Sequence, residues 1–307
     1  DDNLEAFVND NLGRGYKIYN HYRHIFPKEK FLLSPPKASG DIYVAGMYFE
    51  EYIKNNCPNG ARVFVSCTPA KKVANLMGYD AIQLPQEDMN DMLLYIRYNG
   101  FGKTNAINTN FGCLLRPLLQ RNNNLYRIVD TNTAHQRIIF KSQDRHVKVE
   151  LSQKNSDKIF EENHLRVDRT ILFVPYAYTF PDVPYEHGSR LVEKLTKMGY
   201  DVCTNVAGDE EPIEGTRGVF VPYDQVLDFA NKCAGVIGIR NGLFDIISSS
   251  ESKMVIYYPK SNMLMYGLEG MGLKMTDILE MIIEDNDWDE IVDSTIDFFK
   301  KDNDEEE

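Results

Sequence analysis

The feature that most constrains this chain is an alternation of short apolar runs with amphipathic runs, which occurs twice. In the first half, apolar runs at 30–35, 61–67 and 80–85 are each followed by a segment with helical spacing of apolar residues. The same alternation restarts at residue 170. Strands that alternate with helices predict parallel strands with crossover helices. We therefore predict an α/β fold with two parallel sheets.

The expected elements follow from these patterns. In the first half we predict helices at 42–56, 68–78 and 87–100, after a helical stretch at 4–26 that is broken around Gly13 and Gly15. In the second half we predict strands at 170–176, 200–206, 234–240 and 253–259, and a short extended segment at 219–223. The helices between them are expected at 189–199, at 224–233 and from 243. Residues 275–301 are predicted to form two helical pieces.

The length of 307 residues suggests two domains, at about 150 residues per domain. We place the N-terminal Rossmann-like domain at 1–165 and the C-terminal one at 166–285. Residues 286–307 then form a C-terminal helix and an acidic tail. We consider an arrangement in which this helix packs back on the N-terminal domain.

Charge and composition exclude several classes of function. The net charge of −12 argues against nucleic-acid partners, because these require basic patches that neutralise phosphates. Five scattered cysteines without a C-x-x-C pair predict reduced thiols in a cytoplasmic protein. No apolar run reaches transmembrane length. The chain begins at Asp1 rather than at a methionine, as a trimmed chain would, and targeting signals could precede this residue.

Three loops at the carboxyl ends of expected strands could bind a ligand, since open parallel sheets bind ligands there. The first loop follows the strand at 30–35 and contains Lys37, Ser39, Gly40 and Asp41. Asp41 either caps the following helix or faces a cleft as a general base, with Lys37 holding an anion beside it. Neither G-x-G-x-x-G nor a P-loop is present, so neither type of phosphate loop is predicted.

The second loop follows the strand at 170–176 and is rich in aromatic residues. Tyr176, Tyr178 and Phe180 could stack on a flat ring, and Glu186 and His187 lie near the start of the next helix. The alternative is an ordinary long loop packed by its own aromatic side chains. Because no second His or Cys stands at ligand spacing, we expect no metal site here.

The third loop follows the apolar strand at 234–240. Arg240, Asn241 and Gly242 precede a helix that contains Asp245. A guanidinium and backbone amides at a helix start form a cradle suited to a diphosphate. The alternative is a structural ion pair between Arg240 and Asp245, with Gly242 serving the turn.

Taken in order, these loops resemble those of GT-B glycosyltransferases, and within that fold the heptosyltransferase-like family 9 enzymes that build bacterial surface polysaccharides. The resemblance rests on "KASGD", on "ILFVPYAYTFPDVPYEHGSRLVEKLTKMGYDVCTNV" and on "VIGIRNGLFDIISSS". The chain departs from the family in its second loop, which lacks the family's basic residue and Trp. Arg240-Asn241-Gly242 also stands in place of Asp-x-Gly, and Asp245 stands where the family has His.

The resemblance implies two Rossmann-like domains facing a central cleft, the acceptor sugar on the N-terminal side and the nucleotide-sugar donor on the C-terminal side. Asp41 would act as base in an inverting transfer, with Lys37, Ser39 and Gly40 near the acceptor or a phosphate. The diphosphate would be bound by the third loop and by Tyr176 and Tyr178. No metal or other cofactor is implied. The acceptor would be a glycan or a lipid-linked sugar, which allows peripheral contact with a membrane.

Two other functions remain open at this stage. A sugar-nucleotide epimerase on the same fold would use acid–base side chains around the sugar, for which Asp182, Glu186 and His187 are available. A non-catalytic module that binds nucleotides or sugars would retain the cleft without the chemistry.

Overall fold

The computed structural model describes residues 2–109, 131–142, 149–178, 180–260 and 267–300. The chain divides into two compact units. Unit 1 comprises Asp1–Leu125 and Asn132–Ser152, and unit 2 comprises Tyr126–Thr131 and Gln153–Glu307. The main boundary therefore falls near residue 152, earlier than the predicted 165. None of the helices in the described ranges has the length and apolar character needed to span a membrane.

Unit 1 is built on a four-stranded parallel sheet in the order β3-β2-β1-β4. Its strands are β1 (Lys30–Ser34), β2 (Ala61–Val65), β3 (Ile82–Gln83) and β4 (Ala106–Asn108). Its helices are α1 (Asp2–Ile25), α2 (Ser39–Gly46), α3 (Phe49–Asn56), α4 (Thr68–Leu76), α5 (Gln86–Asn99), α6 (Phe101–Thr104) and α8 (Thr131–Phe140). One core cluster joins α1 and α5 to the sheet through Tyr19, Phe31, Phe64 and Met92. The predicted strands at 30–35 and 61–67 and the predicted helix at 87–100 are confirmed.

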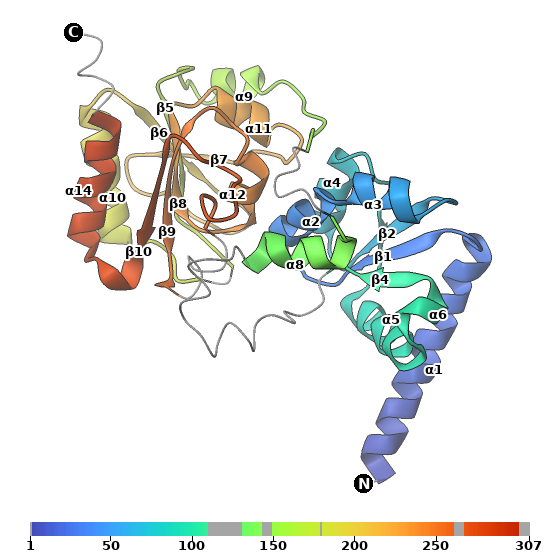
Figure 1. The fold of residues 1–307 in the computed structure, drawn as a ribbon. Helices are drawn as coiled ribbons and strands as arrows, with labels where there is room; N and C mark the ends of the chain where they lie inside the picture. Colours follow the sequence, from blue (N-terminus) through green and yellow to red (C-terminus); the bar gives the residue numbers. More distant parts are fainter. Residues whose placement is uncertain (1, 110–130, 143–148, 179, 261–266, 301–307) are drawn as a thin grey trace. The chain divides into compact units, whose positions relative to one another are not determined.

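Unit 2 contains a six-stranded parallel sheet in the order β10-β9-β8-β5-β6-β7 (Figure 1). Its strands are β5 (Thr170–Val174), β6 (Asp201–Asn205), β7 (Arg217–Val219), β8 (Gly235–Ile239), β9 (Lys253–Tyr258) and β10 (Ile278–Ile282). Its helices are α9 (Asp157–Glu162), α10 (Tyr185–Lys197), α11 (Val226–Asn231), α12 (Gly242–Ile247), the 3-10 turn η2 (Ile283–Asp285) and α14 (Trp288–Lys300). The predicted pair of Rossmann-like α/β domains is thus confirmed.

Three predicted elements differ from the structure. The stretch at 275–301 is not two helices, because Ile278–Ile282 forms β10 in parallel register with β9. The apolar run alone fits either state, and pairing with a neighbouring strand selects the strand. The helix predicted at 42–56 is divided into α2 and α3. The stretch at 4–26 is a single helix, α1, that runs through both glycines.

Gly15 has a packing role that explains why α1 is not broken there. A Cβ at this position would lie 2.1 Å from the Asp91 carbonyl oxygen of α5. The absence of a side chain therefore allows the backbones of α1 and α5 to approach closely. Arg14 donates a 2.7 Å hydrogen bond to the Asp91 carboxylate at the same crossing.

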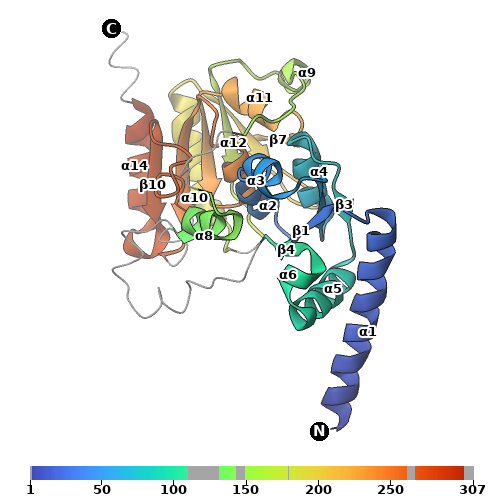
Figure 2. The ribbon, with the colours of Figure 1, turned by 45° about the vertical axis from the view of Figure 1, so that its right-hand side comes forward.

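The last helix, α14, is part of unit 2; packing on the N-terminal domain was the arrangement considered for it from the sequence. In two views α14 lies beside α10 on one face of the sheet (Figure 1, Figure 2). Ile291, Ile296 and Phe299 belong to the core cluster of unit 2. A Cβ at Gly235 would lie 2.5 Å from the Phe299 ring, so the helix is seated directly on β8.

The four cysteines in the described ranges form no disulfide, and Cys113 lies outside these ranges. Cys57, Cys203 and Cys233 are buried. Burial raises the pKa of Cys203 to about 12, so this thiol stays protonated.

Candidate functional site

Both sheets reverse their strand order beside their first strand. In unit 1, β2 and β4 flank β1, and in unit 2, β6 and β8 flank β5. Ligands of open parallel sheets bind outside the carboxyl ends of the strands at such a switch point. In unit 1 the loop at 35–38 leaves this point, and in unit 2 the loops at 175–184 and 240–241 do. All three loops singled out in the sequence therefore stand at switch points.

In unit 1 the loop after β1 is held by Ser66, which follows β2. The Ser66 hydroxyl lies 2.8 Å from the Pro35 carbonyl oxygen and 3.2 Å from that of Pro36. This anchor fixes the chain that enters α2, and it was not recognised in the sequence. Its only signal was a serine near the end of the predicted strand at 61–67, and serine is common at strand ends.

The residues proposed in this loop differ in exposure. Lys37 is exposed, Ser39 and Gly40 are buried in the first turn of α2, and Asp41 is half-buried. The helix begins after Ala38, so Asp41 lies in its first turn rather than at the N-cap. The capping alternative, in the form of an N-cap, is therefore wrong. A carboxylate in the first turn is still favoured by the helix dipole.

In unit 2 the side chain of Asn241 joins the two loops of the switch point. Its Oδ1 accepts a 3.0 Å hydrogen bond from the Leu243 amide and so caps α12. Its Nδ2 donates a 3.1 Å hydrogen bond to the Tyr176 carbonyl oxygen. The backbone amides of Asn241 and Gly242 are expected from the sequence to bind a diphosphate. The structure shows that the side chain fixes the loop at 175–184 relative to the start of α12.

The aromatic residues of the loop at 175–184 have different environments. Tyr178 is fully exposed, and Tyr185, at the start of α10, is 55% exposed. Phe180 instead packs against the core of unit 2. The Tyr176 hydroxyl donates a hydrogen bond to the Glu211 carbonyl oxygen in the loop after β6. Of the predicted stacking residues, Tyr178 presents the most ring surface, and Phe180 is already in use by the core.

Arg240 and Asp245 form an ion pair inside unit 2. They are only 5% and 4% exposed, and the Arg240 guanidinium donates to the Asp245 carboxylate and to the Asn241 carbonyl oxygen. The alternative of a structural ion pair is therefore what the structure shows. A charged strand end indicated a ligand, but α12 brings Asp245 back over the strand end and neutralises the guanidinium first.

The electrostatics of this pair extend to β9 and β10. Burial alone would lower the pKa of Arg240, but the charge of Asp245, with Tyr258 and Glu280 nearby, outweighs burial and raises it. The Tyr258 hydroxyl donates to the Glu280 carboxylate, which also accepts a 2.7 Å hydrogen bond from the Leu268 amide. Burial raises the pKa of Glu280, against the effect of these hydrogen bonds. A buried polar network thus underlies this edge of the sheet.

The acid–base candidates of the epimerase alternative have different environments. His187 stacks on Trp288 of α14, with ring centroids 5.9 Å apart, and its Nδ1 lies 3.5 Å from the Asp289 carboxylate. Glu186 is exposed, and the Asp182 carboxylate accepts a 3.3 Å hydrogen bond from the Ala177 amide. These contacts give His187 a place in the seam between α10 and α14.

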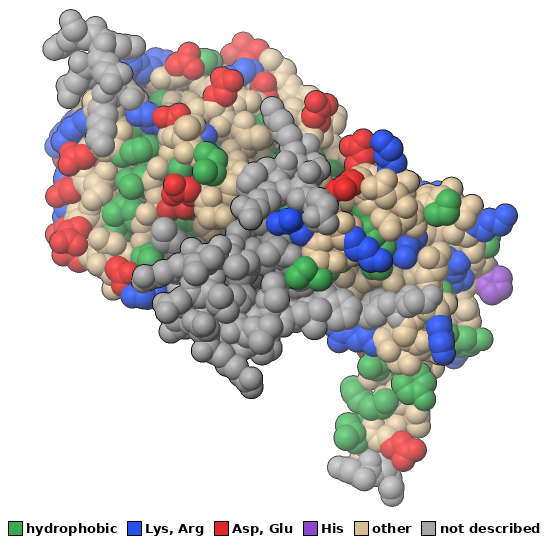
Figure 3. Space-filling view, viewed as in Figure 1, with side chains coloured by type: hydrophobic (Ala, Val, Ile, Leu, Met, Phe, Trp, Pro, Cys, Tyr) green, Lys and Arg blue, Asp and Glu red, His purple; other side chains and the backbone are tan. Residues whose placement is uncertain are grey.

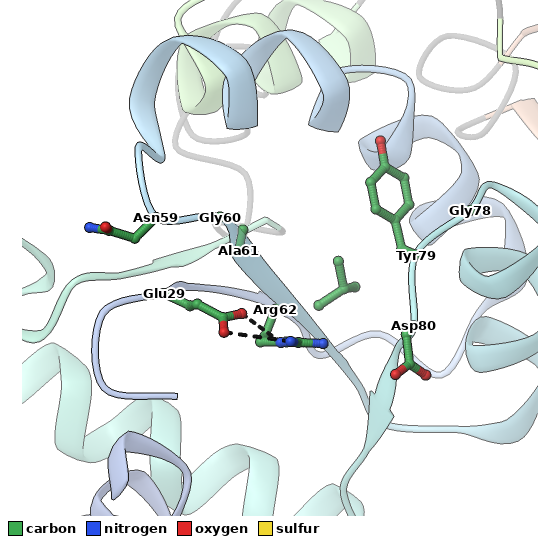
Figure 4. A pocket seen from close by; sticks show the side chains of 9 residues that line it. Glu29, Asn59, Gly60, Ala61, Arg62, Gly78, Tyr79 and Asp80 are labelled. Atoms are coloured by element: carbon green, nitrogen blue, oxygen red, sulfur yellow. Dashed lines mark hydrogen bonds and ion pairs between the residues drawn. The ribbon is translucent and has the colours of Figure 1, made fainter. Parts of the chain in front are cut away.

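An open pocket of about 450 Å³ lies in unit 1 at the amino ends of the strands, whereas the switch point lies at their carboxyl ends. It is lined at the starts of β1 and β2 by Glu29, Asn59 and Arg62, and by Tyr79 and Asp80. Figure 4 shows the Glu29 and Arg62 side chains directed toward each other, and they are joined by a 2.6 Å ion pair. Ligands of this fold class bind at the carboxyl ends of the strands, so we do not assign the active site to this pocket.

Within the described ranges, no group of three or more His, Cys, Asp or Glu side chains is arranged to hold a metal ion.

No protein-family model matches the chain, and no curated protein sequence matches it. Solved structures do resemble it. ADP-heptose lipopolysaccharide heptosyltransferase II of E. coli superposes with a TM-score of 0.57 at 14% identity, covering 89% of this chain and 99% of the other. A family 9 glycosyltransferase of Veillonella parvula gives 0.52 at 13% identity, covering 84% and 86%. The E. coli heptosyltransferase WaaC with ADP gives 0.52 at 11% identity, covering 89% and 99%. The chain therefore has a fold like that of the GT-B glycosyltransferases.

Proposed function

We propose that this protein is a glycosyltransferase that moves a sugar from a nucleotide-sugar to a glycan or lipid-linked acceptor, in the synthesis of surface polysaccharide. The observation that carries this proposal is the switch point of unit 2, where Asn241 ties an aromatic loop to the start of α12. The likeness of the fold to heptosyltransferases supports it.

Unit 2 would bind the donor. We propose that the backbone amides of Asn241 and Gly242 bind phosphate oxygens, because amides at the start of a helix favour anions; the Leu243 amide in the same turn donates to Asn241 Oδ1. Tyr178 offers an exposed ring for stacking on a base or sugar. The buried Arg240 guanidinium donates to the Asn241 carbonyl oxygen and to the Asp245 carboxylate, and so links the loop at 240–241 to α12. We therefore propose that Arg240 positions the loop rather than contacting the diphosphate.

Unit 1 would supply the general base. The acceptor hydroxyl oxygen attacks the anomeric carbon and forms the new C–O bond, while the bond from that carbon to the phosphate oxygen breaks. The electron pair leaves with the nucleoside diphosphate, and the hydroxyl proton passes to the Asp41 carboxylate. Attack from the face opposite the leaving group inverts the anomeric centre. Lys37, which is exposed beside Asp41 in the chain, would attract an anionic acceptor.

We also propose that the transfer takes place in the cytoplasm and proceeds without a bound metal ion. The lack of disulfides among the four described cysteines is compatible with a reducing compartment. Chelation with EDTA should leave the transfer rate unchanged, and loss of activity that Mg²⁺ or Mn²⁺ restores would contradict metal independence.

The experiment that tests the function is a ligand screen followed by a transfer assay. Nucleoside diphosphates and nucleotide-sugars are compared by thermal shift, because a ligand that binds only the folded chain raises Tm. We expect one diphosphate series to raise Tm and the matching nucleosides, which lack phosphate, to have no effect. The nucleotide-sugar of that series should then lose its sugar to an added glycan. If no diphosphate compound binds, the proposed function is wrong.

A further inference from the structure

Strand β10 carries a carboxylate in the middle of an apolar run. Its sequence is Ile-Leu-Glu-Met-Ile, with Glu280 at the centre. Figure 3 shows Asp and Glu side chains on the surface of unit 2, whereas Glu280 is half-buried in the sheet. A carboxylate taken out of water costs free energy unless hydrogen bonds compensate for the lost hydration. The partners of Glu280 therefore explain how the strand tolerates it.

The Glu280 carboxylate joins three parts of unit 2. One of its oxygens, Oε1, accepts hydrogen bonds from the hydroxyl of the buried Tyr258 and, at 2.7 Å, from the Leu268 amide. The other, Oε2, accepts a 3.4 Å hydrogen bond from the Glu269 amide. The parallel register of β9 and β10 places Tyr258 and Glu280 on the same face of the sheet. The carboxylate thus ties the segment 267–274 to both strands.

This cluster adjoins the loop after β8, which we propose binds the donor phosphates. The Arg240 amide donates a 3.0 Å hydrogen bond to the Tyr257 carbonyl oxygen, so Arg240 leaves β8 beside Tyr258. Its guanidinium donates to the Asn241 carbonyl oxygen. Tyr258 and Glu280 both lie close enough to Arg240 to act on its guanidinium electrostatically. A continuous series of contacts therefore leads from β10 to the loop after β8.

Stability does not account for this arrangement. Burial raises the pKa of Glu280, against hydrogen bonds that lower it, so folding costs free energy where the carboxyl is ionised. An apolar side chain of similar size would avoid this cost. A carboxylate adds direction instead, because it accepts hydrogen bonds from several donors in a defined geometry. The cluster is therefore better explained by the positions that it fixes.

We propose that Glu280 is a positioning residue of the donor site, which fixes Tyr258 and the segment 267–274 and acts through Arg240 on the loop after β8. The inference rests on the proposed function, because it concerns the site assigned to the nucleotide-sugar. Glu280 itself contacts no substrate. It contributes to donor affinity by holding the Arg240 guanidinium, and with it the Asn241 carbonyl, in one position.

The experiment is calorimetric titration of the full chain with ADP, GDP and UDP in turn. Glu280→Gln retains the size of the side chain but removes its charge and one acceptor oxygen. It should raise the Kd of the diphosphate that binds by about threefold to tenfold, as substitutions that act through a neighbouring residue do. Glu251→Gln is the matched control, because Glu251 is exposed before the amino end of β9, and it should bind like the wild type.

Transfer kinetics distinguish positioning from a general loss of structure. Glu280→Gln should raise KM for the nucleotide-sugar and leave KM for the acceptor unchanged, since the acceptor is assigned to unit 1. Urea unfolding should show that the variant is folded. Tyr258→Phe, which retains the ring and loses only the hydroxyl, serves as a second variant and should raise the same Kd by a smaller factor.

A double variant shows whether Glu280 acts through the loop after β8. Asn241→Ser disturbs this loop directly, so adding Glu280→Gln to it should raise Kd by less than the product of the two separate factors. If the wild type binds none of the three diphosphates, the proposed donor site is wrong and this inference falls with it. If the wild type binds and both Glu280→Gln and Tyr258→Phe keep its Kd, or if the two factors multiply, this inference alone is overturned.

Discussion

The two switch points occupy the same position in their sheets but use charged residues differently. In unit 1, Lys37 is exposed and Asp41 is half-buried at the start of α2. In unit 2, Arg240 and Asp245 are buried and neutralise each other, and Tyr178 in the loop after β5 presents a fully exposed aromatic ring. The comparison teaches that a charge at the end of an apolar strand has two possible uses. It stays accessible to a ligand when the following helix leaves it exposed, and it supports the loop when the helix brings back a counter-charge.

The largest expected effect is on the stability of unit 2. Arg240→Ala leaves the Asp245 carboxylate buried without its partner, which should cost about 3–5 kcal/mol in the free energy of unfolding. Lys37→Ala in unit 1 should change it by less than about 0.5 kcal/mol, as surface substitutions generally do. Urea unfolding of the full chain measures both.

A double variant sharpens this test. Arg240→Met combined with Asp245→Leu removes both charges, and it should lose less stability than Arg240→Ala alone. If Arg240→Ala proves as stable as Lys37→Ala, the two switch points do not differ as described.

The next effect is on catalysis and concerns unit 1. Asp41→Asn should lower the rate of sugar transfer by about 100-fold or more, because it removes the proposed general base. The dissociation constant of the nucleotide-sugar should stay unchanged, since the donor is assigned to unit 2. Asp80→Asn is the control, because Asp80 lines the pocket at the amino ends of the strands of the same sheet. This variant should transfer sugar at the rate of the wild type. Retention of full transfer by Asp41→Asn would remove Asp41 from its proposed role.

A smaller effect separates the two hydrogen bonds of Asn241. Asn241→Ser retains an N-cap oxygen but cannot reach the Tyr176 carbonyl, whereas Asn241→Ala loses both contacts. We expect both variants to weaken nucleotide binding to a similar extent, by several-fold. Only Asn241→Ala should also lose about 1 kcal/mol of stability, the typical worth of a cap. Calorimetric titration and urea unfolding together show whether loop position or helix capping supports binding.

The smallest effect is on acid stability and involves surface carboxylates of unit 2. Burial alone would raise the pKa of Asp228, but hydrogen bonds from Lys232 and Ser156 outweigh burial and lower it. A carboxyl whose pKa is lowered by folding stabilises the folded chain above its unfolded pKa of about 3.9. This stability is lost as the pH falls through the lower folded value. Asp228→Asn should therefore unfold with a shallower dependence on pH between about 5 and 2, and a slope equal to that of the wild type would contradict this.

Part of the fold and of the candidate site could be read from local patterns. Short apolar runs with intervening amphipathic helices placed the strands β1, β2, β5, β6, β8 and β9, because periodicity is a property of neighbouring residues. Position at a strand end likewise identified the loops at Lys37, Tyr176 and Arg240. β10 could not be read in this way, because an apolar run becomes a strand only beside a paired neighbour such as β9.

The sequence by itself determined two parallel α/β units and the loops that follow their strands, because alternation of strands with helices predicts parallel pairing and each strand ends where its apolar run ends. Only the tertiary structure decided what the side chains in those loops contact. Arg240 and Asp245 are five residues apart, and their pairing depends on the direction in which α12 returns over the sheet. The contact between Asn241 and Tyr176 spans 65 residues, so only the folded sheet brings the two together.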